Sequence, residues 1–195
     1  DTTFRKAAWS TDLICGKQVT TAAGSRFTVF TPEMQNTLRI YAAEGGNILV
    51  SGAHIATDIW DQIYPVQIDS AFRAESKAFA REVLGYKWVR NHGSKEGTVR
   101  YVRSTRFSSS KGKAFGFYNS MNDRCYCVEK PDGIAPVSSK TGSTFIRYDD
   151  TDISAGVCHE GNGYRAVSLG FPIETLKEEK SIDNIIKTTL EFFSK

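Results

Sequence analysis

Serine, histidine and aspartate lie close together in one short segment of the chain. Ser51, His54 and Asp58 follow directly on the apolar run Asn47-Ile48-Leu49-Val50. A serine nucleophile, a histidine base and an aspartate that holds the histidine are the groups that acyl transfer requires. The pattern has a second interpretation, because Asp58 suits the first turn of a helix and a serine hydroxyl often bonds to local backbone. The sequence favours this turn chemistry and leaves the three residues as a candidate catalytic set.

Three further residues are candidates for chemistry at predicted strand ends. Cys15 precedes Gly16 at the end of a short apolar run, and a thiol there becomes a nucleophile when a helix N-terminus or a histidine lies beside it. The alternative, a buried and inert thiol, fits the usual burial of cysteine better. His159 and Glu160 follow a late apolar strand, but neighbouring side chains on a strand point to opposite faces. We therefore expect these two side chains to diverge.

The cysteines do not predict a metal centre. Cys125 and Cys127 form a C-x-C pattern, and no histidine stands at ligand spacing beyond them. We therefore expect no metal and no cofactor. In an oxidising compartment the sequence allows one disulfide, such as Cys127 with Cys158, but spacing does not fix the pairing. Burial as small free thiols is the alternative, which we favour for at least two of the four.

The chain carries the pattern of a parallel-sheet unit. Thr31-Pro32-Glu33 predicts a helix start, with Thr31 as the N-cap and an acid in the first turn. Gly45-Gly46 ends that helix, and the buried strand Asn47–Ser51 follows at once. Later strands are predicted at 154–158 and 165–169, around the turn 160–163, and Ser181 is expected to cap a final amphipathic helix. Helices that alternate with apolar strands predict an α/β fold.

The stretch from 97 to about 150 has a different character. Short alternating runs are separated there by clusters of Gly, Ser, Asn and Asp, which is typical of antiparallel hairpins. We therefore predict a β-rich antiparallel insertion at 97–150 within a single domain that spans 1–195. Within it, Arg100, Arg103 and Arg106 recur with aromatic neighbours, a pattern suited either to an acidic polysaccharide or to a solvated strand face.

Composition excludes several classes of function. The 195 residues are 40% hydrophobic, and the net charge of +3 is too small to argue for a nucleic-acid partner. No apolar run approaches the roughly 20 residues that span a bilayer. The sequence begins Asp1-Thr2-Thr3, with neither Met nor an apolar signal core, so we expect that a leader was removed or that the segment belongs to a longer polypeptide.

Three segments together resemble a known group of proteins. They are the run 41–58 with its Gly45-Gly46 strand, the run 164–176 that ends in Gly170-Phe171-Pro172-Ile173-Glu174, and the closing helix. This combination resembles the class I glutamine amidotransferase-like domain, which implies a three-layer flavodoxin-like parallel sheet. More narrowly, it is similar to C-terminal regions of large secreted bacterial proteins that carry the labels xanthan lyase or amidase-associated.

The resemblance implies the kind of protein to which the chain belongs, but it does not imply a reaction. The family presents its cysteine on a Gly-x-Cys-x-Gly elbow, which this sequence lacks, so the catalytic role does not transfer. The expected function is a non-catalytic or vestigial module of a multidomain carbohydrate- or cell-wall-processing protein. We expect that protein to be secreted, periplasmic or attached to the cell surface. Its expected partners are polysaccharide or cell-wall glycan and other domains of the same polypeptide. The alternative is a hydrolase of an amide, ester or glycan, with Ser51 or Cys15 as nucleophile at the strand ends.

Overall fold

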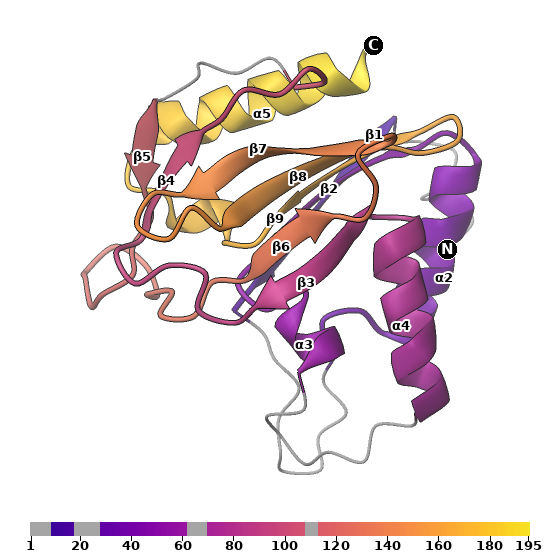
Figure 1. Cartoon of the computed structure of the whole chain (residues 1–195), viewed down its shortest axis with the longest axis horizontal. Coiled ribbons are helices and arrows are strands. Elements are labelled where there is room, and N and C mark those ends of the chain that lie inside the picture. The colour runs from indigo at the N-terminus through magenta and orange to yellow at the C-terminus, as the bar shows by residue number, and fades with distance from the viewer. Residues whose placement is uncertain (1–8, 18–27, 62–69, 108–112) are drawn as a thin grey trace.

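The computed structural model describes residues 9–17, 28–61, 70–107 and 113–195 (Figure 1). Within these residues, seven strands form one mixed sheet in the order β1-β2-β9-β8-β7-β4-β5, and two more strands form a separate antiparallel ribbon, β3-β6. The strands of the main sheet are β1 Ser10–Gly16, β2 Asn47–Gly52, β4 Thr98–Tyr101, β5 Ala114–Gly116, β7 Gly142–Tyr148, β8 Ser154–Glu160 and β9 Arg165–Leu169. The ribbon and the helices are β3 Tyr86–Arg90, β6 Gly133–Pro136, α2 Pro32–Ala43, α3 Thr57–Trp60, α4 Ser70–Glu82, α5 Glu179–Phe193 and the short 3-10 helix η1 Ile173–Thr175.

The first part of the sheet is parallel, as the sequence predicts. Strand β1 pairs in parallel with β2, and β2 pairs in parallel with β9, with Ile48 opposite Ala166 and Ser51 opposite Leu169. The predicted strands at 47–51 and 165–169 are therefore confirmed, and they lie side by side. The helix between β1 and β2 also begins as predicted, because the Thr31 side chain accepts a hydrogen bond from the Met34 amide at 3.3 Å.

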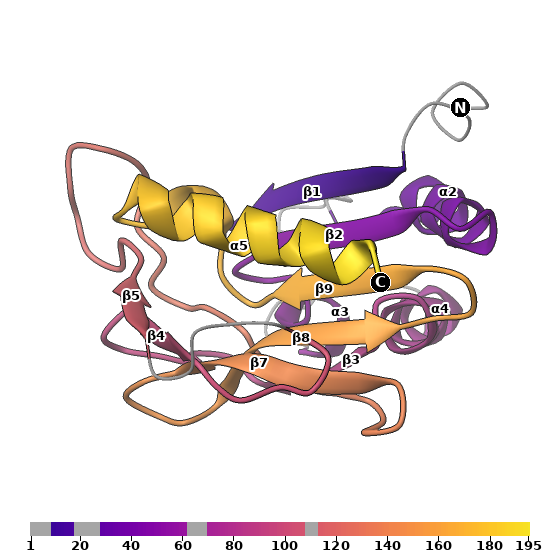
Figure 2. The same cartoon turned by 90° about the horizontal axis from the view of Figure 1, so that it is seen from above.

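The predicted three-layer, flavodoxin-like or amidotransferase-like parallel sheet is wrong. Beyond β9 the main sheet continues through β8, β7, β4 and β5, and each of these strands pairs antiparallel with its neighbour. The connection between β8 and β9 is the short turn 161–164, and so short a link closes a hairpin rather than a parallel crossover. The resulting sheet is mixed, and most of its pairings are antiparallel (Figure 2).

The strands of the segment 97–150 are divided between the two sheets. Strands β4, β5 and β7 extend the main sheet, whereas β6 leaves it and pairs antiparallel with β3, with Trp88 opposite Ile134. The described residues 124–128 lie between these strands and form bends and irregular backbone rather than a further hairpin strand. Strand β6 begins at Gly133.

Both faces of the main sheet are covered. Helices α2 and α4 and the β3-β6 ribbon lie on one face, and α5 crosses the other (Figures 1 and 2). Side chains of β2 alternate between the two cores: Ile48 and Val50 pack toward the side of α2 and α4, and Leu49 packs toward the side of α5. Within the described residues, no helix is long and apolar enough to cross a membrane.

Candidate functional site

The carboxyl ends of the three parallel strands meet at one end of the sheet. Gly16 lies opposite Gly52, and the Ala53 amide donates to the Gly16 carbonyl at 2.8 Å. A Cβ placed on Gly52 would lie only 2.8 Å from the Cβ of Cys15, so the two backbones pack too closely for a side chain there. Polar groups at this end must therefore come from the loops that follow the strands, the usual place for ligands in α/β sheets.

Asp132 fixes the loop that follows β2. Its carboxylate accepts hydrogen bonds from the amides of Ala56 at 2.6 Å and Thr57 at 2.9 Å, and also from the Thr57 hydroxyl. Its backbone amide donates to the Gly170 carbonyl at 2.7 Å, at the end of β9. Burial raises the pKa of Asp132 to about 7, although the hydrogen bonds from Thr57 and Ala56 favour the ionised form. Asp132 therefore ties the segment before β6 to the loop after β2 through its carboxylate and to the end of β9 through its backbone amide.

Tyr126 and Glu174 form a polar pair above the end of β1. The Tyr126 hydroxyl donates to Oε1 of Glu174 at 2.5 Å, and a Cβ on Gly16 would lie 3.3 Å from that hydroxyl. The second carboxylate oxygen of Glu174 is buried and has no hydrogen-bond partner. Burial, followed by the hydrogen bond to Glu174, raises the pKa of Tyr126, so the hydroxyl stays protonated and available as a donor. The pair leaves one strong acceptor unused at the strand ends.

Lys17 places a positive charge beside this pair. Its ammonium group donates to the Cys127 carbonyl at 3.0 Å and to Glu129 at 3.4 Å, and it lies 5.7 Å from the centre of the Tyr126 ring. Lys17 and Glu129 are both exposed, with 42% and 57% of their side chains accessible. An ion pair so open to solvent contributes little free energy, so Lys17 can move at low cost.

His54 lies at the same end of the sheet in its neutral form. Burial lowers the pKa of His54 to about 4, and the positive charges of Lys130, His92 and Lys17 lower it further. Its Nδ1 atom is buried and has no hydrogen-bond partner. His54 is therefore an uncharged imidazole at neutral pH with one nitrogen unused.

Ser51, His54 and Asp58 do not form a hydrogen-bonded triad. Ser51 is fully buried and its hydroxyl has no hydrogen-bond partner, so it does not bond to His54. Asp58 accepts a hydrogen bond from the Val29 amide at 2.9 Å and lies in the first turn of α3. The turn interpretation of this segment thus agrees with the observed contacts of Asp58.

Cys15 is not activated as a nucleophile. Burial, followed by the negative charges of Asp12 and Glu174, raises the pKa of Cys15 to about 12. Its thiol donates weakly to the Leu13 carbonyl, with 3.8 Å between the atoms. All four cysteines are free, and Cys158 is buried beside Ser143 rather than paired with Cys127.

His159 and Glu160 lie at the opposite end of the sheet. Because β8 runs against β9, Glu160 stands opposite Arg165, the first residue of β9. His159 is buried against Tyr164, with ring centres 6.2 Å apart, and burial lowers its pKa. Glu160 accepts a hydrogen bond from Arg106 at 2.8 Å. The structure therefore separates these two candidates from Ser51, His54 and Cys15.

Arg100 and Arg106, two of the three arginines considered for binding an acidic polysaccharide, form ion pairs with carboxylates of the same chain. Arg100 pairs with Asp149 at 2.9 Å and also with Asp152. Arg106 pairs with Glu160, whereas Arg103 is exposed. These contacts favour the solvated strand face over a continuous anion-binding surface.

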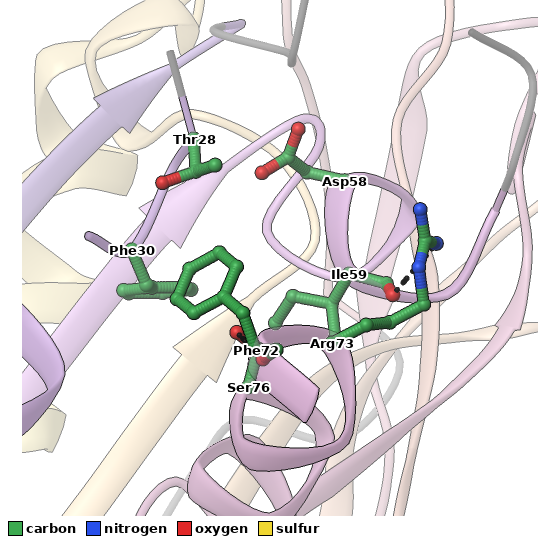
Figure 3. A pocket seen from close by; sticks show the side chains of 7 residues that line it. All are labelled: Thr28, Phe30, Asp58, Ile59, Phe72, Arg73 and Ser76. Carbon is green, nitrogen blue, oxygen red and sulfur yellow. Dashed lines mark hydrogen bonds between the residues drawn. The ribbon is translucent and has the colours of Figure 1, made fainter. Parts of the chain in front are cut away.

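A small cavity beside α3 and α4 contains Asp58 (Figure 3). Phe30, Phe72 and Arg73 also line it, and the Arg73 guanidinium donates to the Ile59 carbonyl at 3.3 Å. Its volume of about 10 Å³ accommodates roughly one water molecule. The cavity is therefore too small for a substrate.

The sequence predicts only some of the polar residues at the carboxyl ends of the parallel strands. The loops after β1 and β9 are the ones that the strand-end rule selects, so Lys17 and Glu174 lie where ligands are expected. Tyr126 and Asp132 carry no such signal, because their segment is far away in the chain and reaches the site only through the fold. Among the described residues, no cluster of three or more His, Cys, Asp or Glu side chains is arranged to hold a metal ion.

Comparisons with known proteins do not place the chain in a family. No family model matches the sequence, and no curated protein matches it. Among solved structures, the chain is similar to the exo-beta-1,4-mannosidase Op5Man5 from Opitutaceae bacterium strain TAV5, with a TM-score of 0.43 and 11% identity. The alignment covers 85% of this chain and 22% of the mannosidase chain. The mixed, mostly antiparallel sheet overturns the expected membership of the glutamine amidotransferase-like group.

Proposed function

We propose that this chain is a non-catalytic module that binds a polyhydroxylated ligand, such as a stretch of polysaccharide, at the carboxyl ends of β1, β2 and β9. The observation that carries the proposal is a pair of buried polar atoms at this end that lack hydrogen-bond partners in the described part of the chain, Oε2 of Glu174 and Nδ1 of His54. Buried polar atoms without partners are uncommon in folded proteins and call for an explanation.

The chemistry of the cluster suits sugar hydroxyls. A hydroxyl group both donates and accepts, so it can donate to Glu174 or neutral His54 and accept from Lys17. The Tyr126 ring adds an aromatic surface beside these groups, and aromatic rings combine an apolar body with a polar tip. The exposed Lys17 side chain can turn toward such a ligand at low cost, because its ion pair with Glu129 is weak.

The contacts of the candidate nucleophiles support a binding role over a hydrolytic one. Nucleophilic catalysis requires a base within hydrogen-bond reach of the nucleophile. Ser51 has no hydrogen-bond partner, and the Cys15 thiol is protonated at neutral pH. A hydrolase would need both groups to be rearranged.

The proposal includes a setting as well as a ligand. Cell-wall glycans lie outside the cytoplasm, so we propose that the chain works in a secreted, periplasmic or cell-surface protein. In that setting it would hold substrate for other domains of the same polypeptide.

Isothermal titration of the purified chain with soluble polysaccharides tests this proposal. The panel contains a neutral glucan, a neutral mannan and an acidic polysaccharide. We expect saturable binding to at least one of them and at least a tenfold loss of affinity in Glu174→Gln, because the substitution removes a charged acceptor. Glu75→Gln, a matched change at an exposed position of α4, should bind as the unmodified chain does.

Two results would overturn the proposal. One is the absence of binding to every polysaccharide in the panel while circular dichroism shows a folded chain. The other is release of reducing ends that Ser51→Ala or Cys15→Ala abolishes, which would establish the hydrolase alternative.

A further inference from the structure

A second cavity lies on the other side of the sheet, between the edge strand β1 and helix α5. It has a volume of about 100 Å³ and is lined by Asp12 and Leu49 from the strands and by Ile186, Thr189, Leu190 and Phe193 from the helix. Asp12 stands opposite Leu49 in the sheet, so both side chains face α5. Figure 2 shows α5 passing along this face next to β1 and β2.

Thr189 provides an unused hydroxyl in this cavity. The residue is 1% exposed, and its Oγ1 atom has no hydrogen-bond partner. The neighbouring Thr188 behaves in the usual way for a helix, because its hydroxyl donates to the Asn184 carbonyl at 2.7 Å. Thr189 lacks the matching bond to its own helix, which leaves the group for something that enters the cavity.

The opposite wall provides a negative charge. Asp12 lines the cavity and is exposed to solvent, and its partial desolvation, followed by the charge of Glu174, raises its pKa to about 6. The carboxyl group is therefore mostly ionised at neutral pH, in surroundings that disfavour its charge. A bound cation would stabilise the ionised carboxylate, and so offset both its desolvation and its repulsion from Glu174.

Apolar groups form the rest of the wall. Leu49 and Phe193 are each 4% exposed and give a dry floor, whereas Leu190 is 42% exposed at the rim. Leu190 is thus an apolar residue of α5 that the core leaves partly uncovered. A cavity with apolar walls, one carboxylate and one free hydroxyl matches a ligand with an aliphatic stem and a cationic head.

We propose that the cavity between β1 and α5 binds a primary alkylammonium group, with Asp12 as the charge partner, Thr189 as a hydrogen-bond acceptor and the apolar wall around the stem. The volume is several times the roughly 10–15 Å³ that one water molecule needs in a cavity, and it suits the four-carbon stem of a lysine side chain. The ligand is either a lysine of a partner polypeptide or a small free amine. Glu174 acts on Asp12 through its charge, but the residues that line this cavity differ from those of the proposed polysaccharide site, so either proposal can fail without the other.

Titration of the ¹⁵N-labelled chain with n-butylammonium, followed by ¹H–¹⁵N correlation spectra, tests the inference. We expect saturable shifts in amides of Ser10–Asp12 and Ile186–Phe193. Neutral n-butanol should bind at least tenfold more weakly, because it lacks the charge that Asp12 recognises. A second titration uses lysine whose α-amino and α-carboxyl groups are both blocked as amides. Binding of this blocked lysine assigns the site to a lysine of a polypeptide. Binding of n-butylammonium alone assigns it to a free amine.

Variants at the two polar groups make the test specific. Asp12→Asn should weaken n-butylammonium binding at least tenfold, and Thr189→Val should weaken it about threefold. Thr188→Val is the matched control, since its hydroxyl serves its own helix, and should leave the affinity unchanged. Equal binding of n-butanol, the absence of saturable shifts in these segments, or undiminished binding in the folded Asp12→Asn variant would each overturn the inference.

Discussion

At the scale of single residues, Asp132 holds the polar end of the sheet together. It is fully buried, and its carboxylate serves the amides of Ala56 and Thr57. The substitution Asp132→Ala leaves these two amide donors buried without an acceptor. We therefore expect the free energy of unfolding to fall by about 3 kcal/mol. Urea denaturation measures this loss. The control Asp123→Ala changes an exposed aspartate and should cost less than about 0.5 kcal/mol; equal effects of the two substitutions would contradict the assigned role of Asp132.

His54 makes the free energy of unfolding depend on pH, and the burial of its side chain determines the sign of that dependence. Burial lowers the pKa of His54 in the folded chain to about 4, below its ordinary value of 6.5. As the pH falls below 6.5, the unfolded chain takes up a proton that the folded chain does not accept, so the free energy of unfolding decreases until about pH 4. Between pH 7 and pH 5 we expect a contribution of about 1 to 2 kcal/mol.

Comparison of the unmodified chain with His54→Gln isolates this contribution. Other titrating groups, including Asp132 with its raised pKa, affect both proteins and cancel in the difference between their urea unfolding curves at each pH. A difference that stays constant from pH 7 to pH 5 would show that His54 titrates normally.

The sequence predicts residues at strand ends, but it does not predict which distant segments the fold brings into contact with them. The strand-end rule selects the loops that contain Lys17 and Glu174, because that rule needs only the order of the strands. The partner of Glu174 is Tyr126, 48 positions away, in a segment with no regular secondary structure. Likewise, the sequence places His159 at a strand end without showing that its strand runs in the opposite direction.

At the scale of secondary-structure elements, local signals predict the helices and most strands but not their directions. The Thr31 cap and the Gly45-Gly46 stop depend on neighbouring residues only, so α2 and β2 appear where they are expected. The apolar runs of β8 and β9 suggest a parallel sheet, yet only four residues, 161–164, separate them. A parallel crossover needs about a dozen residues, so the length of this turn carries the decisive information.

Two glycines at element ends should differ sharply in their tolerance of a side chain. Gly85, between α4 and β3, has a φ of +74° and packs against the His159 ring, which a Cβ would overlap. Gly163, in the turn between β8 and β9, has a φ of +81° but nothing within 4 Å of the Cβ position. We expect Gly163→Ala to cost about 1 kcal/mol from backbone strain alone.

Gly85→Ala adds a steric clash in the core to that strain. We therefore expect a loss of about 3 kcal/mol or more in thermal or urea unfolding. Similar losses for both variants would mean that His159 moves aside easily and is not held against this turn.

At the scale of the whole molecule, the order of strands in the sheet differs from their order in the chain. Strand β9, near the C-terminus, lies between β2 and β8, whereas β1 and β5 are the two edges. All residues of β2 are buried, as are all but the last of β8, while β1 and β5 contain exposed positions. Long-range pairing thus concentrates the stability in the centre of the sheet.

This arrangement predicts the pattern of amide hydrogen exchange. We expect the slowest exchange in β2, β9 and β8, because their amides become accessible only when the sheet as a whole opens. Exchange in β1 and β5 should be at least tenfold faster, since an edge strand can separate without breaking the central pairs. Mass spectrometry of proteolytic fragments resolves these segments. Protection in β1 equal to that in β9 would show that something covers the free edge of β1, and would contradict the expected gradient from the centre of the sheet to its edges.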